Sequence, residues 1–336
     1  MTPTNPTKAT TQAHPNIALI KYWGKRDTAL FLPQTPSLSM TLSGLSAKTT
    51  VEFSTAFKAD RVELDGQSVQ GRELERFTML LDRVRGLAGI SERARIASRN
   101  DFPKAAGLAS SAAGGAALTS ATALAAGLDL SAHELSRLAR QFSGSACRSI
   151  EGGFCEWQKG VRSDGEDSFA VQIAPSTHWP ELRMVVTICS EAKKAMSSRL
   201  AMQHSVDTSP FFEGWVRQVD LDLELARSAL LARDLDALGP IVETNACRMH
   251  AVAMGAHPPT IYLKPVTLEV IEAVHGFRRD GIQAWFTLDA GPNPVVLCLD
   301  TDAACVAQAL SAVPGVLRTV TASPGEGATL LDEHLF

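Results

Sequence analysis

The segment PKAAGLASSAAGGAALTSATALAA, residues 103–126, tells most about the fold of this chain. Residues 110–126 are rich in Ala, contain no Pro and begin with Ser, which predicts a buried α-helix. Small side chains ahead of the helix let backbone amides approach an anion, and the helix dipole adds partial positive charge there. The loop is not a Walker A motif, because no Gly-Lys-Ser or Gly-Lys-Thr closes it. Phosphate binding and close packing against a sheet are both open interpretations.

Hydrophobic patterns elsewhere predict a mixture of strands and helices. Alternating or continuous apolar residues predict strands at 48–54, 60–65, 183–189, 283–288, 295–299 and 317–322. Helical spacing predicts helices at 72–87, 131–142 (with Ser131 as N-cap), 211–231, 235–254 and 267–280. Because strands and helices are segregated along the chain, we expect an α+β fold in two lobes.

Polar and Pro-containing stretches indicate the domain organisation. Residues 1–13 are polar, rich in Thr and Pro, and lack the apolar core of a signal peptide. We therefore expect a flexible tail on a cytoplasmic protein. The stretch 174–180 is the best junction between halves, which predicts an amino domain at 14–182 and a carboxy domain at 183–336.

Composition excludes several classes of protein. The 336 residues carry 32 Lys and Arg against 36 Asp and Glu, a net charge of −4. A mildly acidic chain without a basic tail is poorly suited to nucleic acid, and no apolar run approaches the ~20 residues of a membrane helix. The six cysteines form no CxxC pair, so we expect reduced thiols rather than a metal site.

A group of cations follows an apolar strand near the amino terminus, in HPNIALIKYWGKRD, residues 14–27. Within six positions the strand is followed by Lys21, Tyr22, Trp23, Lys25 and Arg26. Cations beside rigid aromatic rings suit an anionic small molecule. The alternative is a solvated strand end with Trp23 in the core.

Two further segments place polar groups next to predicted regular structure. In SGSACRS, residues 143–149, Ser145 and Arg148 would share one helix face, and Arg can hold a carboxylate through two hydrogen bonds. In TLDAGPN, residues 287–293, Asp289 ends an apolar strand. A carboxylate held there could act as a base or orient a hydroxyl, while a turn-forming role is the alternative.

Taken together, these segments resemble the diphosphomevalonate decarboxylase family, within the superfamily of galactokinase, homoserine kinase, mevalonate kinase and phosphomevalonate kinase. NIALIKYWGKRD, PKAAGLASSAAG, SGSACRS and DAGPN occur in the family's order. Residues 193–209 resemble its second-lobe phosphate segment, and His250 and residues 258–262 also follow its pattern. The similarity runs from about Asn16 to about Gly327.

The resemblance implies a ribosomal-protein-S5-like amino domain that binds ATP, a ferredoxin-like carboxy domain, and a homodimer. The cofactors that it implies are ATP and Mg²⁺. The implied reaction phosphorylates the 3-hydroxyl of (R)-5-diphosphomevalonate. Loss of phosphate and CO₂ then gives isopentenyl diphosphate.

The resemblance also implies roles for individual residues. The implied catalytic residues are Asp289 as base, Lys21 at the reacting centre and Arg148 on the substrate carboxylate. The implied substrate contacts are Asn16, Tyr22, Trp23, Lys25, Ser145, Arg148, Ser197 and Ser198. The implied ATP contacts are Pro103, Lys104, Ala106, Gly107, Leu108, Ala109, Ser110 and Ser111. The hydroxyl of Ser111 or of Ser110 is the expected protein ligand of Mg²⁺, and coordination by ATP oxygens and water alone is the alternative.

Three positions depart from the family pattern. Lys104 stands where many relatives have a small hydroxyl residue, residues 35–37 read TPS instead of Asn-Ser-Ser, and Ala201 replaces a typical Gly. The first two leave the number of phosphates on the substrate open. A 5-phosphomevalonate decarboxylase giving isopentenyl phosphate, and a mevalonate 3-kinase that does not decarboxylate, are therefore the alternatives.

Overall fold

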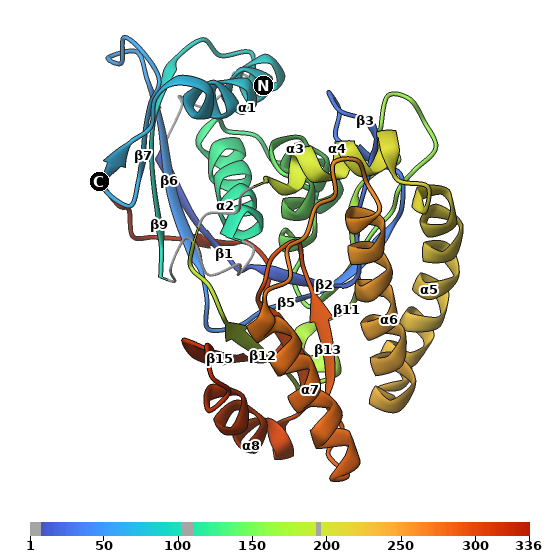
Figure 1. The fold of residues 1–336 in the computed structure, drawn as a ribbon. Coiled ribbons are helices and arrows are strands. Elements are labelled where there is room, and N and C mark those ends of the chain that lie inside the picture. Colours follow the sequence, from blue (N-terminus) through green and yellow to red (C-terminus); the bar gives the residue numbers. More distant parts are fainter. Residues whose placement is uncertain (1–7, 102–109, 193–195) are drawn as a thin grey trace.

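Two β-sheets build the first lobe of the computed structural model, which describes residues 8–101, 110–192 and 196–336 (Figure 1). The larger sheet has the order β16 (Thr329–Leu331), β1 (Lys8–Ala13), β6 (Ala47–Ser54), β9 (Arg93–Asn100), β7 (Arg61–Leu64) and β8 (Gln67–Ser68). The smaller sheet has the order β11 (Ala170–Ala174), β10 (Phe154–Trp157), β5 (Ser37–Thr41) and β2 (Asn16–Ile20). A hairpin of β3 (Lys25–Asp27) and β4 (Leu32–Pro33) follows β2.

The helices of the first lobe are α1 (Gly71–Ala88), α2 (Ser110–Ala125), α3 (Ala132–Phe142) and the short 3-10 helix η1 (Gly144–Ser149). The small residues of α2 let it approach its neighbours closely: a Cβ on Gly115 would lie 2.8 Å from the Cβ of Ala146 in η1. Ser131 is the N-cap of α3, as predicted, and it forms a capping box with Glu134. The Ala-rich helix predicted at 110–126 is confirmed.

The second lobe contains one antiparallel sheet, in the order β13 (Trp285–Leu288), β14 (Pro294–Leu299), β12 (Leu182–Ile188) and β15 (Arg318–Ala322). Its helices are η2 (Ser176–His178), α4 (Ser198–Thr208), α5 (Phe212–Ala232), α6 (Leu235–Met254), α7 (Pro265–Arg279) and α8 (Asp300–Ser311). Met184 and Val186 of β12 face the core that α5 and α6 share, whereas Val185 faces the core beneath α7 and α8. Both faces of β12 are therefore buried, which explains its continuous apolar run.

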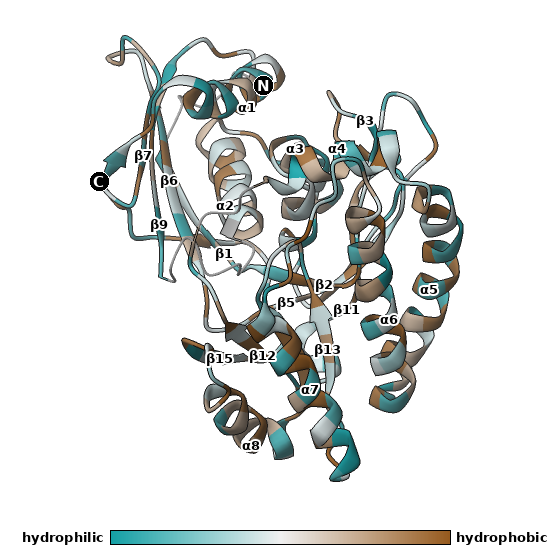
Figure 2. Ribbon diagram, viewed as in Figure 1, coloured by the Kyte–Doolittle hydropathy of each residue, from teal (hydrophilic) through white to brown (hydrophobic). Residues whose placement is uncertain are grey.

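One hydrophobic core spans the two lobes. It joins Ile17 of β2 and Trp23, which follows β2, to Trp215 of α5 and Met249 of α6. In Figure 2 the helices α5, α6 and α7 carry both hydrophobic and hydrophilic colour around their circumference, as helices with one buried face do. This core holds the end of β2 against α6. Within the described ranges, no helix is both long and apolar enough to cross a membrane.

The predicted α+β fold in two lobes is confirmed, and every helix and strand predicted above has a counterpart. The expected flexible tail is wrong for residues 8–13, which form β1 between β6 and β16. Its threonines favour extended backbone, and their hydroxyls find partners: Thr10 Oγ1 lies 2.7 Å from Thr50 Oγ1, and Thr11 Oγ1 donates to the Ala117 carbonyl at 2.6 Å. Residues 1–7 lie outside the described residues.

The expected carboxy domain, 183–336, is wrong at its end. β16 pairs with β1, and the backbone N–H of Leu335 donates to Thr50 Oγ1 at 2.9 Å. The last residues of the chain therefore pack on the first lobe, because β1 offers an unpaired strand edge that β16 fills.

Candidate active site

A lysine and an aspartate from different lobes form an ion pair at the ends of two strands. Lys21 follows β2, Asp289 follows β13, and Lys21 Nζ lies 2.6 Å from Asp289 Oδ1. Lys21 Nζ also donates to the Ala18 carbonyl at 2.8 Å. The side chain of Lys21 is 2% exposed and that of Asp289 is 35% exposed, so the carboxylate alone reaches solvent. Burial lowers the pKa of Lys21, and the charge of Asp289 opposes that shift.

Arg148 is buried among neutral acceptors. Its Nε and Nη2 donate to Asn16 Oδ1 at 3.1 and 3.0 Å, and its Nη1 donates to Ser37 Oγ at 2.7 Å. Asn16 is held in turn, because its Nδ2 donates to Ser149 Oγ at 2.7 Å. Among the residues that the structure describes, no carboxylate pairs with Arg148 within 4.0 Å. A buried guanidinium with only neutral partners is suited to an anionic ligand.

The hydroxyl of Tyr22 is buried and makes no hydrogen bond within the described part of the chain. The ring packs on Trp157 with centroids 4.7 Å apart, and a Cβ on Gly144 would lie 3.1 Å from Tyr22 Cε1. Burial raises the pKa of Tyr22, so the phenol stays protonated at physiological pH. Tyr22 therefore offers a fixed donor beside η1, the helix that carries Arg148.

A group of cations surrounds Phe31, the residue just before β4. Lys25 Nζ lies 3.8 Å from the centre of the Phe31 ring, and Arg199 Cζ of α4 lies 5.0 Å from it. Burial lowers the pKa of Lys25 to about 8, with further contributions from Arg199 and from Arg76 of α1. Positive charge from Arg199 and Arg76 beside Lys25 favours a ligand with several negative charges.

Two residues of α6 lie behind the ion pair. Asn245 Oδ1 accepts from the backbone N–H of Lys21 at 2.8 Å, and His250 Nε2 lies 3.2 Å from the carbonyl oxygen of Asp289. Burial lowers the pKa of His250 to about 4, so its ring is neutral near pH 7. Asn245 was not among the predicted site residues, because nothing in the local pattern of α6 indicates a partner 224 residues away.

Family models match both halves of the chain. The diphosphomevalonate decarboxylase-like N-terminal domain matches residues 13–170, and the mevalonate 5-diphosphate decarboxylase C-terminal domain matches residues 184–324. The chain belongs to the diphosphomevalonate decarboxylase family. The diphosphomevalonate decarboxylase of Ganoderma lucidum is 40% identical over 310 residues, which cover 86% of this chain and 78% of that protein. The human diphosphomevalonate decarboxylase is 39% identical over 305 residues, which cover 85% of this chain and 75% of the human protein.

Solved structures of decarboxylases in this family have the same fold. The mevalonate diphosphate decarboxylase of Staphylococcus aureus has a TM-score of 0.93 at 38% identity, covering 97% of this chain and 98% of that one. The enzyme of Enterococcus faecalis has a TM-score of 0.90 at 40% identity, covering 97% and 99%. A structure of MDDEF in complex with MVAPP, AMPPCP and magnesium has a TM-score of 0.91 at 40% identity, with the same coverage.

Hydrogen bonds and an ion pair join five of the expected site residues: Lys21 with Asp289, and Asn16 with Arg148 and Ser145. Ser145 joins the Arg148 network through its carbonyl, which accepts from Asn16 Nδ2 at 3.0 Å. Ser197 caps α4 and accepts from the Leu200 N–H at 3.3 Å, and Ser198 is the first residue of that helix.

The expected substrate contact of Trp23 is wrong. Trp23 is 1% exposed in the core between the lobes, and its indole N–H donates to Ser205 Oγ at 2.9 Å. An indole with its one donor satisfied and its ring buried has nothing left to offer a ligand. Trp23 lies in the core, as the alternative interpretation of this segment has it, but the strand end is not solvated, because Lys21 is buried as well.

The expected ATP residues Pro103, Lys104, Ala106, Gly107, Leu108 and Ala109 lie outside the described residues. Ser110 begins α2, and Ser111 is exposed in its first turn, which contains no acidic residue. Both positions suit an anion at a helix N-terminus. In the described ranges, no group of three His, Cys, Asp or Glu side chains could hold a metal ion.

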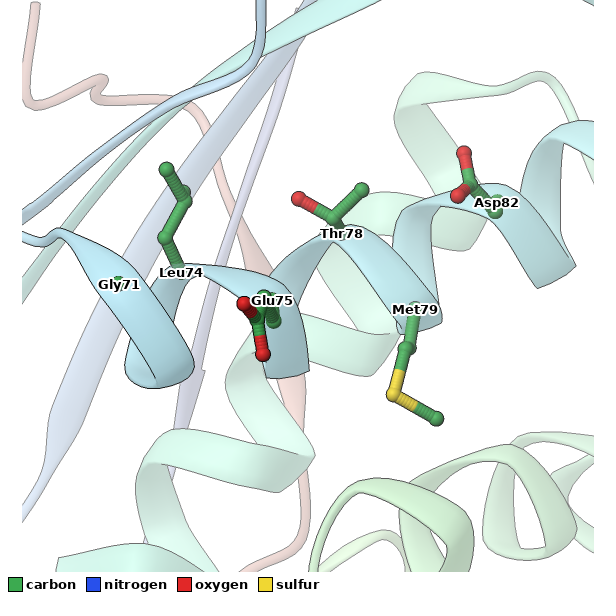
Figure 3. Close-up of a pocket in the computed structure, with 6 residues that line it drawn as sticks. All are labelled: Gly71, Leu74, Glu75, Thr78, Met79 and Asp82. Carbon is green, nitrogen blue, oxygen red and sulfur yellow. The ribbon is translucent and has the colours of Figure 1, made fainter.

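A shallow cavity of about 460 Å³ lies beside α1 in the first lobe. Its described lining residues are Gly71, Leu74, Glu75, Thr78, Met79 and Asp82 (Figure 3). Figure 3 shows Leu74, Thr78 and Asp82 along one side of the helix. Two carboxylates in the lining oppose phosphate binding, so this cavity is a poor place for the phosphates of a nucleotide.

Proposed function

We propose that this chain is an ATP-dependent decarboxylase that converts (R)-5-diphosphomevalonate to isopentenyl diphosphate, ADP, phosphate and CO₂. The observation that carries the proposal is the Lys21–Asp289 pair in a chain that also holds a buried Arg148 without a carboxylate partner among the described residues. Asp289 can activate a hydroxyl, and Arg148 can bind a carboxylate. These two roles fit a reaction that phosphorylates a hydroxyl and then expels CO₂. Membership of the decarboxylase family supports the same reaction.

In the first step Asp289 accepts the proton of the 3-hydroxyl as that oxygen attacks the γ-phosphorus of ATP. A new O–P bond forms, the bond to the ADP oxygen breaks, and ADP leaves. Lys21 stabilises the negative charge on the transferring phosphoryl group while it holds Asp289 in place. The exposed fraction of Asp289 supports this role, because the carboxylate must reach the ligand while its lysine partner stays buried.

In the second step the C3–O bond breaks and inorganic phosphate leaves with the bonding electron pair. The bond between the carboxylate and the adjacent methylene carbon then supplies the electrons of the new double bond, and CO₂ departs. Arg148 would orient the carboxylate so that this bond aligns with the leaving group. Its fixed hydrogen bonds to Asn16 and Ser37 support such a role, because they define the plane of the guanidinium.

The 5-diphosphate would lie at Tyr22, Lys25, Ser197 and Ser198. The phenol of Tyr22, which has no hydrogen-bond partner in the described part of the chain, and the lowered pKa of Lys25 support this assignment, since each gains a favourable partner when an anion arrives. Residues 103–111 would hold the ATP phosphates, with Ser110 and Ser111 at the positive end of α2. Mg²⁺ would neutralise phosphate charge, with Ser111 as its proposed protein ligand.

The same proposal includes the organisation of the protein. We propose an amino lobe from about residue 8 to residue 182, completed by the last residues of the chain, and a carboxy lobe from residue 183 to about 322. We further propose that the protein works as a cytoplasmic homodimer. Gel filtration with light scattering tests the dimer, since a monomeric mass at micromolar concentration would contradict it.

The experiment that tests the substrate offers mevalonate, its 5-phosphate and its 5-diphosphate in parallel, each with Mg-ATP. The proposal predicts CO₂ release with kcat/KM highest for the 5-diphosphate. A preference for the 5-phosphate would make the protein a 5-phosphomevalonate decarboxylase, and a stable 3-phosphate would make it a 3-kinase. Either outcome would overturn the proposal.

A further inference from the structure

Asn245 of α6 is completely buried and makes two hydrogen bonds in opposite directions. Its Oδ1 accepts from the backbone N–H of Lys21 at 2.8 Å, and its Nδ2 donates to Asp222 Oδ2 at 2.8 Å. A backbone N–H can only donate and a carboxylate can only accept, so the chemistry of the two partners fixes the orientation of the amide.

Asp222 of α5 anchors this arrangement from behind. It is 4% exposed, and its carboxylate accepts from Arg248 Nη1 at 2.8 and 2.9 Å and from Gln218 Nε2 at 2.9 Å. The side chain of Arg248 is 42% exposed, so it links the buried charge to the solvent side of α6. The buried carboxylate is therefore compensated, and a fixed acceptor holds Asn245.

The same helix also contacts the other member of the ion pair. His250 lies five residues after Asn245, about 7.5 Å along the helix axis, and its Nε2 lies 3.2 Å from the carbonyl oxygen of Asp289. A carbonyl only accepts, so His250 Nε2 carries the proton. One rigid helix thus holds the backbone of Lys21 in the first lobe and that of Asp289 in the second.

We propose that Asn245 is a positioning residue that sets the spacing of Lys21 and Asp289, and that Asp222 acts through it. The two members of the pair come from different lobes, so their separation depends on how β2 and β13 sit on α6. Loss of the Asn245 acceptor would leave a buried N–H without a partner and let the end of β2 move. A displacement of about 1 Å can reduce turnover by on the order of 100-fold.

The inference rests on the proposed function for its kinetic test. In Asn245→Leu, which keeps the branched shape but removes the donor and the acceptor, we expect kcat for the diphosphate substrate to fall on the order of 10- to 100-fold, with KM within about threefold of the wild type. Asp222→Asn should show a smaller loss of kcat with the same pattern. It also keeps the proposal testable if Asn245→Leu fails to fold.

The matched control is Asp234→Ala, at the N-cap of the same helix. Asp234 Oδ1 accepts from the Ala237 backbone N–H at 2.9 Å, and among the described residues its side chain forms no hydrogen bond with β2 or β13. We expect this variant to lose thermal stability while kcat stays within about twofold. If Asp234→Ala lowers kcat as much as Asn245→Leu, general damage to α6 explains both and the proposal is wrong.

A double-mutant cycle separates positioning from a general structural role. If Asn245 acts through Lys21, Asn245→Leu should change the residual CO₂ release of Lys21→Met by less than about threefold. If the losses of CO₂ release in the two single variants multiply fully in the double variant, the proposal is contradicted. A wild-type kcat in folded Asn245→Leu would contradict it as well.

A crystal structure of Asn245→Leu tests the spacing without any assay. We expect the Lys21 Nζ–Asp289 Oδ1 distance to exceed the 2.6 Å of the wild type by about 1 Å or more. A pair retained at its original distance would overturn the positioning role even if the wild type proved inactive. Wild-type inactivity with a widened pair in the variant would instead overturn only the proposed function.

Discussion

Lys21 and Asp289 stand 268 residues apart in the sequence, yet their side chains meet at 2.6 Å across the junction of the two lobes. Neither residue is useful alone in this geometry. Lys21 is buried and meets the reacting centre only beside Asp289, and the negative charge of Asp289 needs that cation to offset its repulsion of incoming phosphate. The chemistry proposed for the pair therefore requires that the two lobes stay packed together.

Asp289→Asn should lower kcat by about 100- to 10,000-fold, because the amide cannot accept the hydroxyl proton. Steady-state release of CO₂ and ADP measures the effect. Asp220→Asn is the control, since that carboxylate forms an exposed pair with Lys159 at 2.7 Å and should leave kcat unchanged. Near-wild-type turnover in Asp289→Asn would refute the assignment of the base.

Arg148→Gln should reduce CO₂ release more than ADP formation, because the carboxylate loses its orienting cation while the phosphoryl acceptor keeps its base. Quenched-flow sampling should then detect a 3-phosphorylated intermediate that the wild type does not accumulate. Arg137→Gln, which removes a side chain paired with Glu166 at 3.0 Å, serves as the control. Equal losses of both products in Arg148→Gln would argue against a separate role in decarboxylation.

Tyr22→Phe should leave stability almost unchanged, because the hydroxyl has no hydrogen-bond partner in the described structure. The KM for the diphosphate substrate should rise about tenfold, the cost of losing one hydrogen bond to a charged group. Thermal melts and steady-state kinetics on the same preparation test both parts. An unchanged KM would exclude Tyr22 from the phosphate contacts.

The KM for the diphosphate substrate should rise with pH. The pKa of Lys25 is lowered to about 8, mainly by burial. Because the charged form of lysine is the protonated one, the cation is present below pH 8 and is lost as the pH rises through that value. KM measured from about pH 7 to about pH 9.5 should show the increase, and Lys25→Arg should flatten it because arginine stays charged. A rise of the same size in Lys25→Arg would assign it to another group.

Two neighbouring glycines of α2 should respond oppositely to alanine. A Cβ on Gly115 would lie 2.8 Å from Ala146 Cβ, which overpacks the contact with η1 and should cost about 1–3 kcal/mol. A Cβ on Gly114 meets nothing within 4 Å among the described residues, so Gly114→Ala should stabilise the helix by up to about 1 kcal/mol. Urea unfolding compares the two, and equal effects would mean that α2 does not pack closely on η1.

Sequence patterns predicted the parts of this molecule that depend on local chemistry. The Ala-rich composition of α2 predicted a buried helix, and the apolar strand before Asp289 predicted a carboxylate at a fixed strand end. Sequence patterns were misleading where burial in the tertiary structure determines what a residue does. Trp23 lies beside lysines in the sequence but in the core of the fold, and the polar threonines of β1 resemble a tail until β6 and β16 pair with them. Asn245 could not be predicted from the sequence, because its contact with Lys21 forms only in the tertiary structure.

The most direct measurement of the central claim is the stoichiometry of products from (R)-5-diphosphomevalonate with Mg-ATP. Carboxyl-labelled substrate reports CO₂, and coupled assays report ADP and phosphate from the same reaction. We predict equal amounts of ADP, phosphate and CO₂ at every time point in the wild type. ADP formed without CO₂ would contradict decarboxylation, and CO₂ released without ADP would contradict activation of the 3-hydroxyl by ATP.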